Sequence, residues 1–149
     1  MTDADLLEEL NKDVWEPFRA AYREYDTDRY LSLHTANLIR AGGPGRDVQT
    51  YAQVAAETGP WFSDARERGL ELGIDFRFVE RLAAGDLASE RGVYRIVAGD
   101  DVFYGRFHTF SRRVEGRWLI AVDYDAADPT VDEAAFGAGT PIEDLAAHA

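Results

Sequence analysis

The hydrophobic positions at the start of the chain repeat with the period of a helix. Between Leu6 and Tyr25 the apolar side chains are mostly three or four residues apart, which places them on one face. Pro17 lies inside this run, and a proline within a helix removes one backbone hydrogen bond. The pattern therefore predicts an amphipathic helix over residues 6–25 with a kink or a short break at Pro17.

Shorter elements are predicted over the next forty residues. Residues 26–28 offer N-cap side chains for a short helix that carries Tyr30 and His34. Residues 36–41 are typical of a short strand, which the glycines and proline of residues 42–45 end in a turn. That glycine cluster lacks the Gly-Lys-Ser/Thr ending of a phosphate-binding loop, so we expect only a turn.

A third helix is predicted to follow this turn. Asp47 is its expected N-cap, and the helix is expected to end near Gly69. Gly59-Pro60 is expected to break it before Trp61.

After Gly69 the hydrophobic period changes from about 3.6 to 2, which is typical of antiparallel strands with one buried face. Turn residues separate the strands, so consecutive strands should form hairpins in a meander. The predicted strands cover residues 74–78, 88–97, 102–114 and 118–125. The sequence thus predicts an α+β fold with N-terminal helices packed on a mostly antiparallel sheet.

Charge and composition narrow the possible partners. The chain of 149 residues has a net charge of -12 and no cysteine. A strongly acidic protein repels nucleic acid and anionic lipid, and the lack of cysteine excludes disulfides and thiolate metal sites. We therefore expect no nucleic-acid or membrane partner, no cofactor and no metal site, and an acidic N-terminus without a signal peptide predicts a cytoplasmic protein.

The last residues differ in composition from the rest of the chain. Residues 126–149 contain five acidic and no basic side chains and are rich in Ala, Gly and Pro. We predict one domain over residues 1–125, followed by an acidic tail over residues 126–149 that holds at most short helices.

Three stretches resemble the nuclear transport factor 2-like superfamily, and its SnoaL-like and ketosteroid isomerase-like branches are the most similar. The stretches are Asp28–His34 on the second helix, Gly85–Tyr94 in the meander and Gly116–Ile120 at the last hairpin. The resemblance covers roughly residues 5–125. It implies a cone, in which a bent sheet wraps a long helix around a pocket open at one end. Family members use this pocket as an isomerase, cyclase or dehydratase site, or as a plain binding cavity.

The register of the last hairpin decides which side chains face such a pocket. A two-residue turn at Glu115-Gly116 would place Phe107 and Thr109 on the face of Trp118. A three-residue loop would instead place Arg106, His108 and Phe110 on that face. Glutamate is a poor residue for the positive φ that the two-residue turn requires, so we predict the three-residue loop.

On this register the pocket combines an apolar interior with a polar rim. His108, Glu90 and Tyr124 are the predicted catalytic groups, for acid-base chemistry and oxyanion stabilisation. The predicted ligand-binding residues are Arg106, Tyr94, His34, Trp61, Phe110 and Trp118. Alternatives remain open: His108 could only line the pocket, Arg106 could form a buried ion pair with Glu90, and another register would pair His108 with Asp123.

These residues lead to two functional hypotheses. The first is a pocket protein that binds a partly apolar, oxygenated or anionic small molecule, with isomerase-, cyclase- or dehydratase-type acid-base chemistry. The second is a non-catalytic association or accessory domain that acts through the outer sheet face or the acidic tail. We also expect a homodimer through the outer face, where Val93, Val97, Phe103, Phe107 and Leu119 should lie among Arg91, Arg95 and Arg113.

Overall fold

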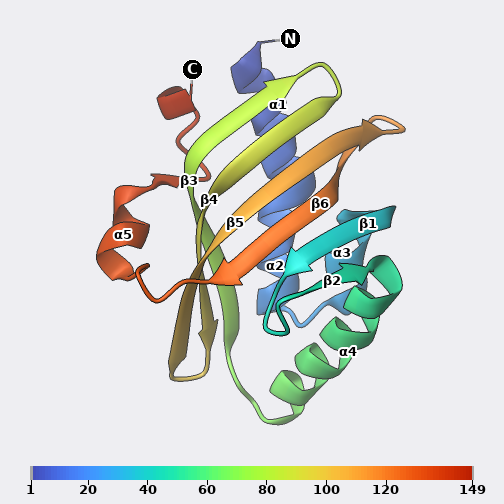
Figure 1. The fold of residues 1–149 in the computed structure, drawn as a ribbon, viewed down its shortest axis with the longest axis vertical. Coiled ribbons are helices and arrows are strands. Elements are labelled where there is room, and N and C mark those ends of the chain that lie inside the picture. The colour runs from blue at the N-terminus through green and yellow to red at the C-terminus, as the bar shows by residue number, and fades with distance from the viewer. Residues whose placement is uncertain (1, 149) are drawn as a thin grey trace.

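The computed structural model describes residues 2–148, and its first element is one long helix (Figure 1). The helix is built from α1 (Asp3–Leu10), a π-helical turn (Asn11–Trp15) and α2 (Glu16–Arg23). The predicted helix is confirmed, but the kink or break expected at Pro17 is replaced by the π turn. Pro17 has no N–H to donate, and the wider turn lets the N–H of Glu16 bond the carbonyl of Asn11.

The next helix and strand meet at His34. Helix α3 (Thr27–Ser32) is capped by the side chain of Asp26, as predicted. Strand β1 (His34–Gly42) begins earlier than expected, so His34 lies on a strand and not on the helix.

Residues 47–50 are the largest departure from the predicted secondary structure. They form strand β2 (Asp47–Thr50), and helix α4 (Tyr51–Glu67) begins after it. Thr50, not Asp47, caps α4 in a capping box with Gln53. The predicted break at Gly59-Pro60 is also wrong, because α4 is continuous through Pro60.

The four long strands form the predicted meander. They are β3 (Leu72–Ala84), β4 (Leu87–Ala98), β5 (Asp101–Val114) and β6 (Arg117–Ala127). The seven-stranded sheet has the order β2-β1-β6-β5-β4-β3-β7, and only β1 and β6 pair in parallel. The predicted α+β fold is confirmed.

The predicted register of the last hairpin is wrong. Val114 pairs with Arg117 across a two-residue turn, in which Glu115 has a φ of 52° and Gly116 a φ of 79°. Glu115 therefore adopts the left-handed conformation that we judged unfavourable for glutamate. This register turns Phe107 and Thr109 towards the helices, and both are buried.

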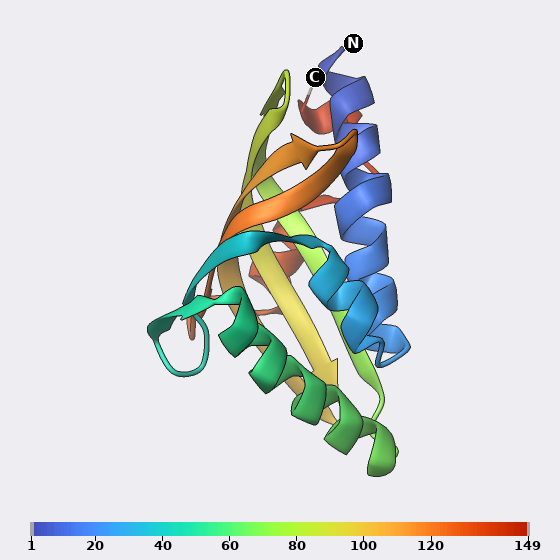
Figure 2. The same cartoon turned by 90° about the vertical axis from the view of Figure 1, so that its right-hand side faces the viewer.

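The sheet curves around the N-terminal helix and encloses the core (Figure 2). Near the N-terminus the space between the two layers is filled by Leu7, Leu10, Trp118 and Ile120. Towards α4 the space between the two layers is not completely filled and forms a cavity. No helix within residues 2–148 combines the length and the hydropathy needed to cross a bilayer.

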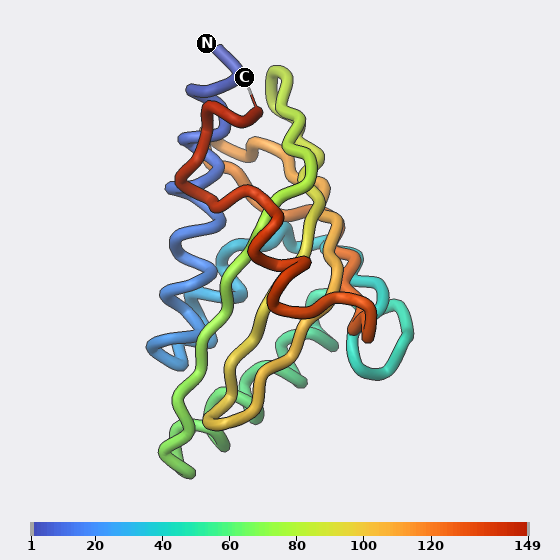
Figure 3. The backbone as a smooth tube through the Cα atoms, turned by 90° about the vertical axis from the view of Figure 1, so that its left-hand side faces the viewer, coloured from blue at the N-terminus to red at the C-terminus, as the bar shows by residue number. Residues whose placement is uncertain are grey.

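The acidic tail packs against the domain. It contains α5 (Glu133–Ala138), β7 (Thr140–Pro141) and a 3-10 turn (Ala146–His148), and it runs along the outside of β3 and β4 (Figure 3). Phe136 is buried between the guanidinium groups of Arg77 and Arg95, each 4.4 Å from its ring centre. Ile142 is buried in the main core. The tail thus covers part of the outer sheet face.

Candidate functional site

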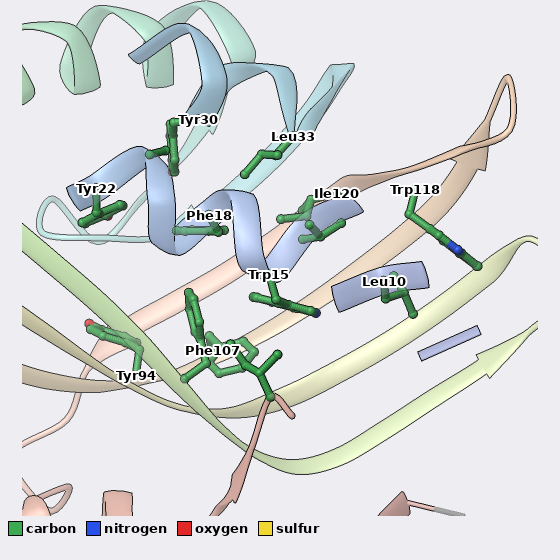
Figure 4. Packing of buried hydrophobic residues seen from close by; sticks show 14 of the residues in the cluster. Leu10, Trp15, Phe18, Tyr22, Tyr30, Leu33, Tyr94, Phe107, Trp118 and Ile120 are labelled. Atoms are coloured by element: carbon green, nitrogen blue, oxygen red, sulfur yellow. The ribbon is translucent and has the colours of Figure 1, made fainter. Parts of the chain in front are cut away.

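A cavity of about 480 Å³ lies between the helices and the sheet at the α4 end of the molecule. This volume is in the range of small-molecule sites. Its walls are mainly aromatic: Phe18 and Tyr22 project from α2 towards Tyr94 and Phe107 on the sheet (Figure 4). The other aromatic lining residues are Trp15, Tyr30, Trp61, Phe76 and Phe103.

Acidic side chains reach this cavity from β6. Asp123 pairs with Thr109 on β5 in the observed register, and Asp125 follows two residues later on the same face. Both aspartates and Thr109 line the cavity, and Asp123 is only 7% exposed. The register of β6 on β5 shifts by one residue between Phe110 and Ser111, and without this bulge both aspartates would face outwards.

Arg40 on β1 binds one of these aspartates. Its Nε and one terminal nitrogen donate to the two carboxylate oxygens of Asp125, both at 3.1 Å. Its other terminal nitrogen donates to Gln49 at 3.2 Å and to Glu57 at 3.1 Å. Burial alone would lower the pKa of Arg40, but the bonds to Asp125 outweigh it and raise the pKa. Arg40 is therefore a charged group whose donors are already occupied.

Asp123 forms no such ion pair with any cation among residues 2–148. Burial raises the pKa of Asp123 to about 8, and the charge of the nearby Asp125 and a hydrogen bond to it act in the same direction, opposed by Arg40. Asp123 is accordingly a mostly protonated carboxyl at neutral pH. In the free protein its one proton is donated to Asp125, and a ligand oxygen in the cavity can accept that proton instead.

Three tyrosine hydroxyls add to the polar lining. Tyr22, Tyr30 and Tyr94 line the cavity, and burial is the main cause that raises the pKa of each. In the chain from residue 2 to residue 148 none of these three hydroxyls forms a hydrogen bond; the tyrosines that do are Tyr25, Tyr51 and Tyr104. Gly105 leaves room for the Tyr94 ring, since a methyl group there would overlap the Tyr94 hydroxyl.

Two of the residues predicted from the sequence to form the site line this cavity. Tyr94 lies on its sheet wall, and Trp61, 38% exposed, lies at its rim beside Tyr22. Both assignments depend on the alternation of β4 and on the position of α4, which the error in the last hairpin does not affect.

Four predicted site residues lie on the outer face of the sheet, so their predicted inward orientation is wrong. Phe110 and Tyr124 are 45% and 47% exposed. His108 stacks on Phe110, and its Nε2 lies 2.8 Å from the hydroxyl of Ser89. Arg106 binds Asp128 at 2.6 Å and is not paired with Glu90. The two-residue turn accounts for the three errors on β5, at Arg106, His108 and Phe110. Tyr124 on β6 is turned outwards by a β-bulge, a one-residue shift of register between Phe110 and Ser111.

Glu90 faces inwards, but it lies outside the cavity in a buried ion pair. Its carboxylate accepts hydrogen bonds from Arg81 at 2.7 Å and from the indole of Trp15 at 3.0 Å. Burial raises the pKa of Glu90, and the charge of Arg81 opposes this effect. Arg81 also donates to Asn11 at 2.7 Å, and Asn11 donates to the carbonyl of Ile142. This network joins the π turn, the sheet and the tail.

His34 and Trp118 are also buried outside the cavity. Trp118 donates from its indole to Glu9 at 3.1 Å. His34 packs against Tyr30, and among residues 2–148 neither of its ring nitrogens has a hydrogen-bond partner. Burial lowers the pKa of His34 to about 4, so this histidine is neutral.

The polar centre of the cavity was missed by the sequence prediction. Asp123 was considered only as a partner of His108, which lies on the opposite face, and Arg40, Asp125, Tyr22 and Tyr30 were not considered. The two-residue register alone would pair His108 with Asp123 on the outer face. The one-residue shift of register between Phe110 and Ser111 turns Asp123 and Asp125 inwards, and the alternation of the sequence does not predict it.

A second hollow of about 420 Å³ lies near the N-terminus and the β3-β4 hairpin. Its wall includes Arg81, Ser89 and His148. Arg81 is already bound to Glu90, and Ser89 to His108, so the aromatic cavity is the stronger candidate site.

No family model and no curated protein matches the sequence. Solved structures do match the fold. A protein of unknown function from Pseudomonas putida KT2440, described as NTF2-like, aligns over 91% of this chain and 94% of its own, with a TM-score of 0.67 and 18% identity. The chain has the nuclear transport factor 2-like fold.

Two further structures support this fold. A conserved protein from Planctomyces limnophilus DSM 3776 aligns over 86% of this chain and 99% of its own, with a TM-score of 0.66 and 21% identity. A candidate calcium/calmodulin dependent protein kinase II association domain from Xanthomonas campestris aligns over 80% and 86%, with a TM-score of 0.67 and 16% identity. At these identities the nuclear transport factor 2-like fold is shared, and function must be argued from the site.

Proposed function

We propose that the aromatic cavity binds a small, neutral molecule with a flat apolar body and an oxygen that accepts hydrogen bonds. Asp123, the proton-bearing carboxyl among aromatic walls, is the observation that carries this proposal. Tyr22, Tyr30 and Tyr94 supply further hydroxyl donors. Such a site has donors and few acceptors, so a carbonyl oxygen fits it better than a hydroxyl or an amine.

The charge of the cavity favours a neutral ligand over an anionic one. Arg40 is the only basic residue lining the cavity within residues 2–148, and it already binds the carboxylates of Asp125 and Glu57. An anionic ligand would therefore meet the carboxylate of Asp125 and no free cation among the described lining residues. The sequence prediction included anionic ligands because Arg106 was expected to face the pocket. Arg106 lies on the outer face and binds Asp128, so the cavity is better suited to a neutral ligand.

Asp123 is also the group best suited to proton donation. A carboxyl whose pKa lies near neutrality can hold a proton at physiological pH and still release it. We assign Asp123 the role of hydrogen-bond donor and general acid towards the ligand oxygen. This role replaces the one that the sequence suggested for His108, Glu90 and Tyr124.

A matched pair of probes tests the ligand class. 2-Acetylnaphthalene and 2-naphthoate have nearly the same shape, but only the second is charged. We expect the ketone to bind at least about tenfold more tightly at pH 7, measured by isothermal titration calorimetry. Equal binding, tighter binding of 2-naphthoate, or binding of neither probe would contradict the proposal.

One matched pair of variants, Tyr94→Phe and Tyr124→Phe, and the further variant Asp123→Leu test the location. Tyr94→Phe and Asp123→Leu each remove a donor from the cavity, so both should weaken binding of the ketone, by roughly 3- to 30-fold. Tyr124→Phe removes the same hydroxyl from the outer face and should leave binding unchanged. Weaker binding in Tyr124→Phe but not in Tyr94→Phe would place the site elsewhere.

A specific surface feature favours the second hypothesis, association through the outer face. One row of paired residues crosses five strands of the sheet: Leu82, Ser89, Phe110, Val122 and Ile39. Leu82 and Ile39, at the two ends of the row, are 55% and 51% exposed, and Phe110 in its middle is 45% exposed. An exposed row of large apolar side chains, interrupted here by Ser89, is typical of an interface.

We propose that this row, beyond the part of the face covered by the tail, pairs with a second copy of the chain. Of the face predicted from the sequence, Phe107 is buried inside and Val93 is covered by the tail. Phe110→Glu should shift the protein towards monomer in sedimentation velocity. Val48→Glu is the control, since Val48 is 69% exposed on β2. A monomeric wild-type protein at micromolar concentration would contradict the proposal.

A further inference from the structure

Arg40 binds the second of two neighbouring aspartates and not the one with which it pairs in the sheet. Arg40 is the β-ladder partner of Asp123, yet its guanidinium reaches along the sheet to Asp125. Both bonds to Asp125 are 3.1 Å, and within residues 2–148 no salt bridge joins Arg40 to Asp123. The structure therefore keeps the cation away from the carboxyl beside it.

Several contacts hold Arg40 in this arrangement. Glu57 on α4 and Gln49 on β2 accept hydrogen bonds from the same terminal nitrogen. Gly43 lies against the guanidinium, and its N–H donates to the backbone carbonyl of Asp125 at 2.8 Å. A guanidinium fixed from three sides forms a bidentate pair in one orientation.

We propose that Arg40 and Asp125 are positioning residues that hold a fixed anion beside Asp123, so that Asp123 keeps the proton it donates to the ligand. Two carboxyls on one face of a strand cannot both be ionised at low energetic cost. Arg40 determines which of them is ionised by binding Asp125. The proposal deepens the proposed function, and it rests on that function only for the identity of the proton acceptor.

The groups that face Asp123 come from five elements. Asp125 lies on the same strand, Arg40 on β1, Tyr22 on α2, Tyr30 on α3 and Tyr94 on β4. The tyrosines remain neutral up to alkaline pH, because burial raises their pKa values above the ordinary value of 10. Asp125 and Arg40 are therefore the two charges that can shift the titration of Asp123 near neutrality.

Carboxyl ¹³C NMR titration of aspartate-labelled protein without ligand tests the proposal. Asp123→Asn identifies the resonance of Asp123 by removing it. Asp125→Asn removes the anion and frees Arg40, so the Asp123 midpoint should fall by at least about one pH unit. Arg40→Gln removes the cation, so the higher midpoint of the aspartate pair should rise. If Arg40 and Asp125 had only a structural role, the two substitutions would not shift the Asp123 midpoint in opposite directions.

Glu57→Gln is the matched control, because it removes a more distant charge that also binds Arg40. It should change the midpoint by less than about 0.3 pH unit, which corresponds to a factor of about two in the proton equilibrium. An unchanged or raised midpoint in Asp125→Asn, or a lowered one in Arg40→Gln, would overturn the proposal. If Asp125→Asn does not fold, Arg40→Gln decides by the sign of its shift.

The result of the titration does not depend on whether the ligand proposal is correct. The titration uses no ligand, so a failure to bind 2-acetylnaphthalene leaves its result valid. Conversely, tight ketone binding with an Asp123 midpoint that neither substitution moves would contradict the role of Arg40 and Asp125 alone.

Discussion

The two ends of the sheet each contain a buried carboxyl, but only one of these carboxyls is paired with a cation. At the filled end Glu90 is completely buried and binds Arg81 and the Trp15 indole. At the hollow end Asp123 is almost as deeply buried, and the neighbouring Arg40 binds Asp125 instead. A paired buried charge stabilises the arrangement around it, whereas an unpaired carboxyl keeps its proton and is available to a ligand.

The long N-terminal helix contributes to both ends. Its π turn presents Asn11 and Trp15 to the Arg81–Glu90 network, and the same Trp15 ring forms a wall of the cavity. One turn later Phe18 and Tyr22 continue that wall (Figure 4). The filled end therefore fixes the helix that shapes the hollow end.

The largest effect is expected at the filled end. Glu90→Gln leaves the Arg81 charge buried without its anion, which should lower the free energy of unfolding by about 3–5 kcal/mol in urea denaturation. Glu133→Gln also removes the partner of an arginine, Arg95, but at an exposed site where solvent screens the charges, so it should cost much less. Equal losses in both variants would contradict the contrast between the two kinds of ion pair.

The hollow end should show the opposite response. Asp123 has a pKa of about 8 in the folded protein and an ordinary one near 3.8 when unfolded. The folded state therefore holds the proton more tightly, and its contribution to stability, present below pH 4, is lost as the pH rises towards 8.

Asp123→Asn should remove this loss. Relative to wild type, the variant should gain on the order of 3 kcal/mol in unfolding free energy between pH 5 and pH 8. Asp128→Asn is the control, because the pKa of Asp128 is held at about 2 by Thr130 and Arg106 and does not titrate in this range. A difference between wild type and Asp123→Asn that does not change with pH would refute the assignment.

His34 is a third buried ionisable group and should give a smaller effect. Burial holds its pKa at about 4 in the fold against 6.5 in the unfolded chain, so wild type should lose stability as the pH falls below 6.5. His34→Phe should remove about 1–2 kcal/mol of this loss between pH 7 and pH 5. His108→Phe on the outer face provides the comparison; an equal effect there would show that burial is not the cause.

The fold was predictable because it depends on long, regular patterns. The apolar positions from Leu6 to Tyr25 specify the helix, and the alternation after Gly69 specifies the meander. Strand β2 was missed because four residues carry too little periodicity to distinguish a strand from a helix start.

The candidate site was predicted only in part, because it depends on two local irregularities. Glu115 adopts a φ of 52°, against the preference of its residue type, and the resulting turn moves His108 outwards. The register shift between Phe110 and Ser111 then moves Asp123 inwards. The pairing of Arg40 with Asp125 could not be predicted either, since it requires the parallel register of β1 on β6, which no local pattern records. Tyr94 and Trp61 were found because they lie outside that hairpin.

The central claim is that Asp123 offers a proton to a neutral ligand in the aromatic cavity. A crystal structure at pH 7 of the protein soaked with 2-acetylnaphthalene tests this claim most directly. We predict the ring system between Phe18 and Phe107, with the carbonyl oxygen within about 3 Å of an Asp123 carboxyl oxygen. A ligand on the outer face, or one in the cavity with its carbonyl directed away from Asp123, would contradict the claim.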